Sequence, residues 1–413
     1  MSKSTWLFIS CLLVGLAVIF LTKPLAAEFS FSNGKQLVAY YFALPLSIFY
    51  FMAVTYLRGP QKFSFWLALL LFFLLMIPFG DSFLKTYAYL EQDDGFRYRV
   101  VATNIAMNQN LWGSDDLIYG TDTRTYMIQP GYRYYLAAWI FLFGEENRLF
   151  QFFNMFVYLI AVLMLLKKME RISIGALFRK GFTLFILLSS FFVVKLILMG
   201  LSEWLAVTLF ILSVCSWFSS SLTLAAILLA LIPFLRQNLL LFSFFVFAWM
   251  VVKEKRKWLF ISLYSSILLL PLYHNLYYAG KWKFFSTYTN TETFLVLDFE
   301  GSYLSKIVKT VLYHVSLYGG INWRLDNHFA NILAVTFIPL GTFLMMYAYF
   351  QLKAGARIWF LLITLSAIVP TLIIGGTAYY PRFEWVNLCL AALAYILLHN
   401  QKNSRKEQLT ALH

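Results

Sequence analysis

Long apolar segments separated by short polar ones repeat along almost the whole chain. Several approach or reach the length that crosses a bilayer as a helix, about 20 apolar residues with a range of about 17–25. The pattern therefore predicts an all-α polytopic membrane protein with about twelve transmembrane helices. The predicted spans lie near Trp6–Leu21, Leu37–Leu57, Phe63–Gly80, Phe150–Leu166, Phe182–Met199, Glu203–Phe218, Leu222–Leu235, Leu239–Val252, Trp258–His274, Phe329–Phe350, Ile358–Ile374 and Trp385–Leu398.

The composition agrees with this pattern, because 61% of the residues are apolar and only 13% are charged. Twelve spans would place both termini on one side of the membrane. That side would hold seventeen of the 33 Lys and Arg residues but only three of the 19 Asp and Glu residues. The net charge of +14 then faces a single compartment, as the positive-inside rule predicts for cytoplasm. Nucleic-acid binding is not supported, since this distribution already accounts for the positive charge.

The spans divide the chain into three parts: residues 1–62 with two helices, a module over 63–252, and the helices of 253–413. Lys3, an apolar core and Leu25-Ala26-Ala27 are also typical of a cleaved signal peptide, so cleavage stays open as an alternative. The short loops favour a bacterial cytoplasmic membrane. The three cysteines all fall inside spans and predict neither a disulfide framework nor a metal site.

The longest polar segments lie on the outer, periplasmic side, at residues 81–148 and 275–328. In the first, Pro130 and Gly144 bracket an apolar helix of about a dozen residues, which reaches about 18 Å and is too short to cross the bilayer. In the second, apolar residues from Leu304 to Val315 follow helical spacing beside a polar face. Both segments predict interfacial helices in the outer loops.

An acid pair, Asp93-Asp94, follows the apolar segment that begins at Phe63. It opens a second helical pattern, in which Phe96, Val100, Val101 and Ile105 would share one face. Acids at such a helix start favour the helix dipole, and a solvated boundary is the alternative explanation. Carboxylates at a membrane boundary beside interfacial helices indicate chemistry on a membrane-borne substrate.

Arg236-Gln237-Asn238 interrupts the apolar run of 222–252. A single helix there would place Lys253 to Lys257 on the outer side, against the charge rule, so we expect two half-length helices. Arg236 then lies below the outer interface, where burying a charge costs about 2.5–3.5 kcal/mol and indicates a functional site. Lys195 is the sole charge in its span, and both snorkelling and function explain it. Glu203 follows Ser202 at a helix start, where a helix cap is an equal explanation.

The order of these motifs resembles that of the GT-C superfamily of membrane glycosyltransferases. The outer loop's Asp93-Asp94-x-x-Arg97-Tyr98 is similar to their Asp-Asp/Glu signature, and Gln129-Pro130-Gly131-Tyr132-Arg133 to their Pro-Pro-x-Tyr helix. Leu201-Ser202-Glu203 and Tyr379-Tyr380-Pro381-Arg382 are similar to further elements. Gln129 stands where those families have their first proline, and two additional spans precede the motif-bearing helix.

This resemblance implies a GT-C-like fold. It also implies transfer of a sugar from a polyprenyl-phosphate carrier to a glycan or glycolipid acceptor on the outer face, as in the protein-mannosyl, aminoarabinose and arabinofuranosyl transferases. The residues fit this chemistry independently. A glycosidase usually needs two carboxylates because its leaving alkoxide must be protonated. A phosphate leaves as a stable anion, so one carboxylate base suffices if cations receive the charge.

The candidate roles follow from this chemistry. Asp93 is the base, and Asp94 is the alternative base or a metal ligand; a divalent cation, Mg²⁺ or Mn²⁺, is compatible with the pair but not required. Lys195, Arg236 and Arg382 would hold the carrier phosphate. The supporting residues are Arg97, Tyr132, Arg133, Glu203 and Gln237, with Glu203 orienting one of the cations. The runner-up is a polymerase or ligase using polyprenyl-diphosphate-linked glycans, followed by a lipid or glycan transporter.

Overall fold

The computed structural model describes residues 94–108, 130–145, 147–170, 196–279 and 354–374, together with residues 182, 185, 186, 190, 193, 194, 282, 344, 349, 350 and 352. Every regular element in this part of the chain is a helix, which confirms the all-α class for the described residues. The chain divides into two compact units. The first comprises 1–75, 171–190 and 292–413, and the second comprises 76–170 and 191–291.

Most of the described helices belong to the second unit. They are α5 (Asp94–Asn108), α7 (Pro130–Phe143), α8 (Asn147–Glu170), α10 (Glu203–Phe218), α11 (Leu222–Leu235), the 3-10 helix η2 (Gln237–Leu239), α12 (Leu240–Lys253), α13 (Lys257–Leu268) and α14 (Leu270–Ala279). In the first unit the structure describes α17 (Ala354–Ile374). The predicted helices over Glu203–Phe218 and Leu222–Leu235 are confirmed residue for residue.

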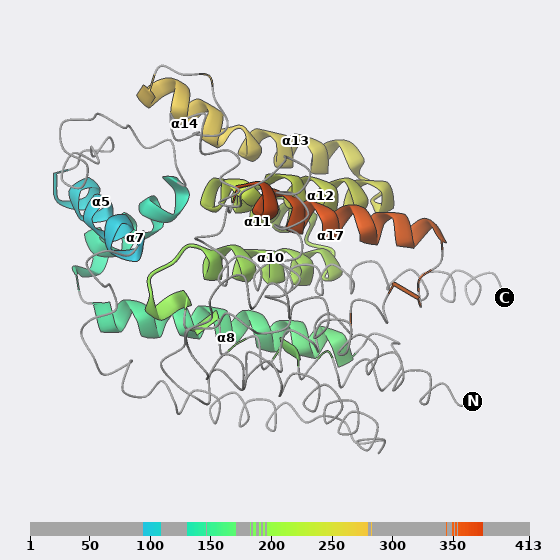
Figure 1. The fold of residues 1–413 in the computed structure, drawn as a ribbon, viewed down its shortest axis with the longest axis horizontal. Coiled ribbons are helices and arrows are strands. Elements are labelled where there is room, and N and C mark those ends of the chain that lie inside the picture. The colour runs from blue at the N-terminus through green and yellow to red at the C-terminus, as the bar shows by residue number, and fades with distance from the viewer. Residues whose placement is uncertain are drawn as a thin grey trace, which may run out of the picture. The chain divides into compact units, whose positions relative to one another are not determined.

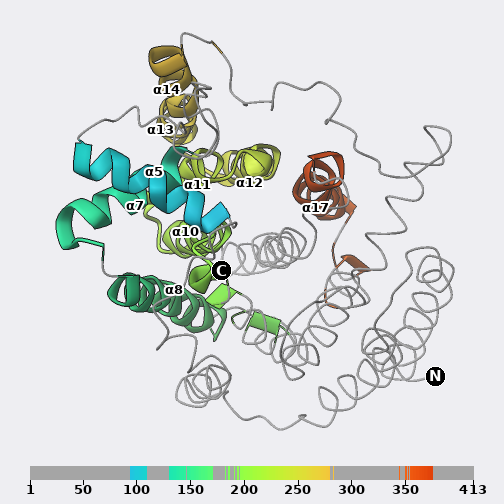
Figure 2. The same ribbon diagram turned by 60° about the vertical axis from the view of Figure 1, so that its left-hand side comes forward.

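The core of the second unit is built around α10. It packs against α8 on one side and α11 on the other, and α11 in turn packs against α13 (Figures 1 and 2). Twelve of the 16 residues of α10 are buried, as expected for a helix that is apolar on all faces. Near one end of these layers, α7 packs against both α11 and α5. The start of α10 and the end of α11 therefore lie near α7.

Helices α10 and α11 form an antiparallel hairpin because only Ser219, Ser220 and Ser221 separate them. Ser220 adopts a positive φ of 60°, and the Ser221 N–H donates to the Ser216 carbonyl at 2.9 Å. The two helices have 16 and 14 residues, so the first residue of α10 comes opposite the residue that follows α11. The hairpin register thus brings Glu203 to Arg236.

A proline inside α11 is compensated by a hydroxyl from the next helix. Pro233 has no N–H with which to satisfy the Leu229 carbonyl one turn earlier. The buried Ser243 hydroxyl of α12 donates to that carbonyl at 2.8 Å, and the Tyr264 hydroxyl lies 2.8 Å from the same Ser243 oxygen. The end of α11 is therefore fixed by both α12 and α13.

Helix α7 has the boundaries that the sequence predicts. It begins at Pro130, whose missing N–H would lack an intrahelical partner anyway, and ends before Gly144. Gly144 has a φ of 79°, and its N–H donates to the Ile140 carbonyl at 2.8 Å. A residue without a Cβ adopts this left-handed conformation at little cost and ends the helix.

Two local predictions are wrong. The continuous helix expected over Trp258–His274 is broken at Leu269, because Pro271 has no N–H for the Ile267 carbonyl and its ring crowds that group. In α5 the predicted face is shifted: Val101 and Ile105 are buried, but Phe96 and Val100 are only half-buried. Tyr98 and Ala102 take their places in the core, because α7 packs against this side of α5.

Among the described residues, one helix is both long and apolar enough to cross a membrane, the 20-residue segment Leu149–Lys168 of α8. The apolar helices Glu203–Phe218, Leu222–Leu235 and Gln237–Lys253 are shorter. Twelve transmembrane helices therefore stay a prediction. The spans predicted before residue 81, the last predicted span and the amphipathic segment near Leu304 lie outside the described residues.

Candidate functional site

A buried ion pair lies where the α10–α11 hairpin opens. Arg236 Nη2 lies 3.0 Å from Glu203 Oε1, and the two side chains are only 4% and 2% exposed. The distance makes this contact an ion pair. Its geometry does not meet that of a hydrogen bond. Two charges withdrawn from water lose several kcal/mol each of hydration, on the order of what their attraction returns. The pair therefore adds little net stability, which makes it a candidate functional site.

The backbone around Arg236 explains how the charge is held in the interior. Its N–H donates to the Ile232 carbonyl at 2.8 Å, and then its φ of −141° and ψ of 102° take the chain out of the helix. The Leu239 N–H donates to the Arg236 carbonyl at 3.0 Å, forming the short helix η2 before α12 begins. The predicted break between two half-length helices is confirmed. Gln237, a predicted supporting residue, begins η2 and is half-buried.

Ser202 contacts the carboxylate of Glu203 and does not cap α10. Its hydroxyl donates to Glu203 Oε2 at 3.5 Å, and it makes no side-chain capping bond to the helix. Its own φ and ψ are helical, whereas a capping residue normally has extended backbone. Helix capping by Ser202 is therefore not the explanation of this motif. Glu203 contacts Arg236, and its role in orienting a phosphate-binding cation stays a prediction.

The two α7 residues predicted to support the site lie in the same neighbourhood. Tyr132 is fully buried, and Trp204 Nε1, beside Glu203, lies 3.4 Å from the Tyr132 hydroxyl, to which it donates. The ring of Tyr98 meets that of Tyr132 edge-on at 5.5 Å. The Arg133 guanidinium lies 5.8 Å from the Tyr98 ring centroid, within cation–π range. Arg133 is buried as well, so two arginines and one glutamate are withdrawn from solvent around α7 and the hairpin.

The next turn of α7 is secured by polar contacts to two other helices. The Tyr134 hydroxyl lies 2.9 Å from His274 Nε2 on α14. The Tyr135 hydroxyl donates to Asn154 Oδ1 on α8 at 2.5 Å. Because the contacts point to opposite partners, they fix the rotation of α7 about its axis, and with it the positions of Tyr132 and Arg133.

Sequence reasoning assigned no role to Trp204, Asn154 and His274, which surround the predicted residues, and Tyr98 entered only as the last residue of the Asp93–Tyr98 motif. The three tyrosines within residues 132–135 are the one local signal, because buried tyrosine hydroxyls usually need hydrogen-bond partners. Their partners come from distant segments. Only the packing of α7 against its neighbours identifies them.

The remaining candidate residues lie partly or wholly beyond what the structure describes. Asp94 begins α5 and Arg97 belongs to its first turn, but only their backbone is described. Asp93, Lys195 and Arg382 lie outside the described residues. Tyr98, one turn after Asp94, contacts Tyr132, so the start of α5 belongs to the same end of the unit as the buried ion pair.

No group of three or more His, Cys, Asp or Glu side chains suited to a metal ion occurs among the described residues. Asp93 and the side chain of Asp94 are not among them, so a divalent cation at this pair stays a prediction. Comparison of the chain with protein-family models, with curated proteins and with solved structures gives no match in any of the three.

Proposed function

We propose that the chain is a membrane glycosyltransferase with a GT-C-like arrangement of about twelve transmembrane helices. It transfers a sugar, with inversion, from a polyprenyl-phosphate carrier to a lipid-linked or cell-envelope glycan on the outer face of a bacterial cytoplasmic membrane. The observation that carries the proposal is the buried contact of 3.0 Å between Arg236 and Glu203 at a break between two half-length helices.

An arginine in this position suits the leaving group of the reaction. Its planar guanidinium stays charged and can bind two phosphate oxygens at once. Glu203 holds one edge of that guanidinium, which favours a fixed orientation over a mobile charge. A preorganised cation stabilises the charge that develops as the phosphate leaves. Lys195 and Arg382 are the further candidates to bind this phosphate.

The base in this mechanism is Asp93, with Asp94 as the alternative. Asp93 removes the proton from the acceptor hydroxyl, and the acceptor oxygen forms a bond to the anomeric carbon of the sugar. The bond from that carbon to the phosphate oxygen breaks on the opposite side, and the phosphate keeps the electron pair. Arg133 and Tyr132 support the arrangement through Tyr98, which joins α7 to α5.

The test compares cells that carry the wild-type chain with cells that carry Asp93→Asn or Asp94→Asn at equal membrane levels. Mass spectra of surface glycans and glycolipids are recorded for each. We expect at least one variant to lose one sugar mass from an otherwise intact glycan, with the other reduced less. Asp115→Asn and Asp116→Asn form the matched control, because they remove a second acid pair from the same outer segment.

The other outcomes decide against the proposal. Shortening of a polymer to a single repeat unit would identify the polymerase alternative instead. Normal glycans in both Asp93→Asn and Asp94→Asn would rule out a catalytic acid pair and favour transport.

A further inference from the structure

The turn between α12 and α13 presents an exposed basic cluster. Its members, which we call the basic turn, are Lys253, Lys255, Arg256 and Lys257, and all four are exposed. The acid within the turn, Glu254, is directed back to the backbone. Its Oε1 accepts the N–H groups of Lys255 at 2.8 Å and Arg256 at 3.3 Å. Glu254 therefore fixes the shape of the turn, while the four cations face outward.

Exposed apolar side chains flank the basic turn on both sides. Val252 is 55% exposed before it, and Trp258 and Leu259 are 81% and 49% exposed after it. Along the sequence, exposed apolar side chains therefore precede and follow the four cations. The chain reverses direction at this turn, between α12 and α13. A lipid leaflet has the complementary profile, with charged headgroups at the surface and acyl chains below them. Tryptophan is also the residue most typical of that boundary.

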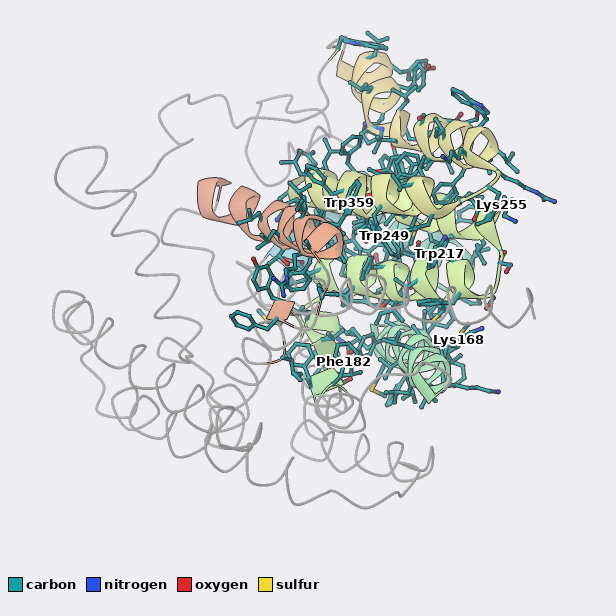
Figure 3. All side chains as sticks on the ribbon, turned by 90° about the vertical axis from the view of Figure 1, so that its right-hand side faces the viewer. Lys168, Phe182, Trp217, Trp249, Lys255 and Trp359 are labelled. Carbon is teal, nitrogen blue, oxygen red and sulfur yellow. The ribbon has the colours of Figure 1, made fainter. Side chains whose placement is uncertain are left out.

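A second basic segment belongs to the same end of this unit. Lys167 and Lys168 lie in the last turn of α8. Helix α8 packs against α10, which is followed by the Ser219–Ser221 turn. Figure 3 shows Lys168 and Lys255 on the face turned toward the viewer, with Trp217 and Trp249 between them in that view. The rings of these two tryptophans are 5.2 Å apart.

We propose that the basic turn binds the headgroups of anionic phospholipids in the leaflet that it faces. Lys255 and Arg256 contact the phosphate, and Trp258 and Leu259 contact the upper acyl chain. Nucleic acid fits less well, because it would leave the flanking apolar side chains in water. This inference depends on the membrane location of the chain but not on its transferase activity.

The test uses the purified full-length protein in detergent and native mass spectrometry. Phosphatidylglycerol and phosphatidylcholine with the same acyl chains are added separately, and the bound lipids are counted. We expect wild type to bind phosphatidylglycerol more tightly. Each surface cation contributes roughly a fivefold effect, so Lys255→Gln with Arg256→Gln should weaken this binding about 25-fold. Lys255→Arg with Arg256→Lys is the matched control and should bind normally.

Three results would overturn the inference. Equal binding of the two lipids would show no preference for anionic headgroups. Unchanged phosphatidylglycerol binding in the glutamine variant would place the lipid elsewhere. Displacement of the lipid by millimolar inorganic phosphate would indicate a simple anion site. The glutamine variant should keep the glycan product of wild type, so failure here is separate from failure of the proposed function.

Discussion

Arg236 and Glu203 are both costly to bury, and each depends on the other. Removing one partner of a buried ion pair leaves an uncompensated charge and costs about 3–5 kcal/mol. Replacing both with apolar residues of similar volume is often neutral. Stability and function can therefore be separated at this pair.

We predict that Glu203→Leu and Arg236→Met each destabilise the protein by roughly 3–5 kcal/mol, and that the double variant recovers most of this loss. Thermal unfolding in detergent measures the stability, and the glycan mass spectrum measures the activity. All three variants should lack the transferred sugar, because none holds Arg236 oriented by Glu203. An active double variant would show that the pair serves the fold alone.

At the scale of helices, α7 packs closely against the end of α11. A Cβ added to Gly131 would lie 2.5 Å from Phe234 Cδ1 and 3.0 Å from the Phe234 carbonyl oxygen. The ring can turn away, but the backbone oxygen belongs to the segment that leads to Arg236. Gly131 therefore allows the close approach of α7 to this segment.

We predict that Gly131→Ala destabilises the protein by about 1–3 kcal/mol, as overpacking does elsewhere. Gly355→Ala in α17 is the matched control, since nothing lies within 4 Å of its added Cβ. An alanine there should be neutral or stabilising by up to about 1 kcal/mol. Thermal unfolding in one detergent compares the two variants. Equal effects would contradict the close approach.

The helix boundaries were predictable wherever the sequence itself interrupts the apolar pattern. Serines end α10, Arg236 ends α11, and Pro130 and Gly144 bracket α7. The apolar pattern alone does not predict the break at Leu269, because Pro271 lies inside an unbroken apolar run. The burial of Arg236 was predictable from the charge distribution. Its contact with Glu203 depends on the hairpin register, and the roles of Trp204 and His274 depend on packing between distant helices.

For the whole molecule, the charge distribution predicts that Glu145 and Lys255 lie on opposite sides of the membrane. Glu145 precedes α8, is paired with Arg99 at 3.6 Å, and is predicted to lie on the outer side. Lys255 belongs to the basic turn, which is predicted to lie on the cytoplasmic side.

The prediction is tested in a chain whose three cysteines are replaced by serine. Glu145→Cys should react with a membrane-impermeant thiol reagent in intact cells, because it faces outward. Lys255→Cys should react only after lysis. Labelling is read as a mass shift on a gel. Reaction of both positions in intact cells would contradict the predicted topology.

The break at Arg236 also determines which changes in chain length the protein can tolerate. One residue inserted into α11 would turn everything after it by about 100° and advance it by about 1.5 Å. The guanidinium would then leave Glu203, and the Ser243 hydroxyl would no longer reach the Leu229 carbonyl. An insertion beside Lys255 would enlarge an exposed turn and leave both helices in place. Homologous chains should therefore vary in length at this turn, while the distance in sequence from Glu203 to Arg236 stays constant.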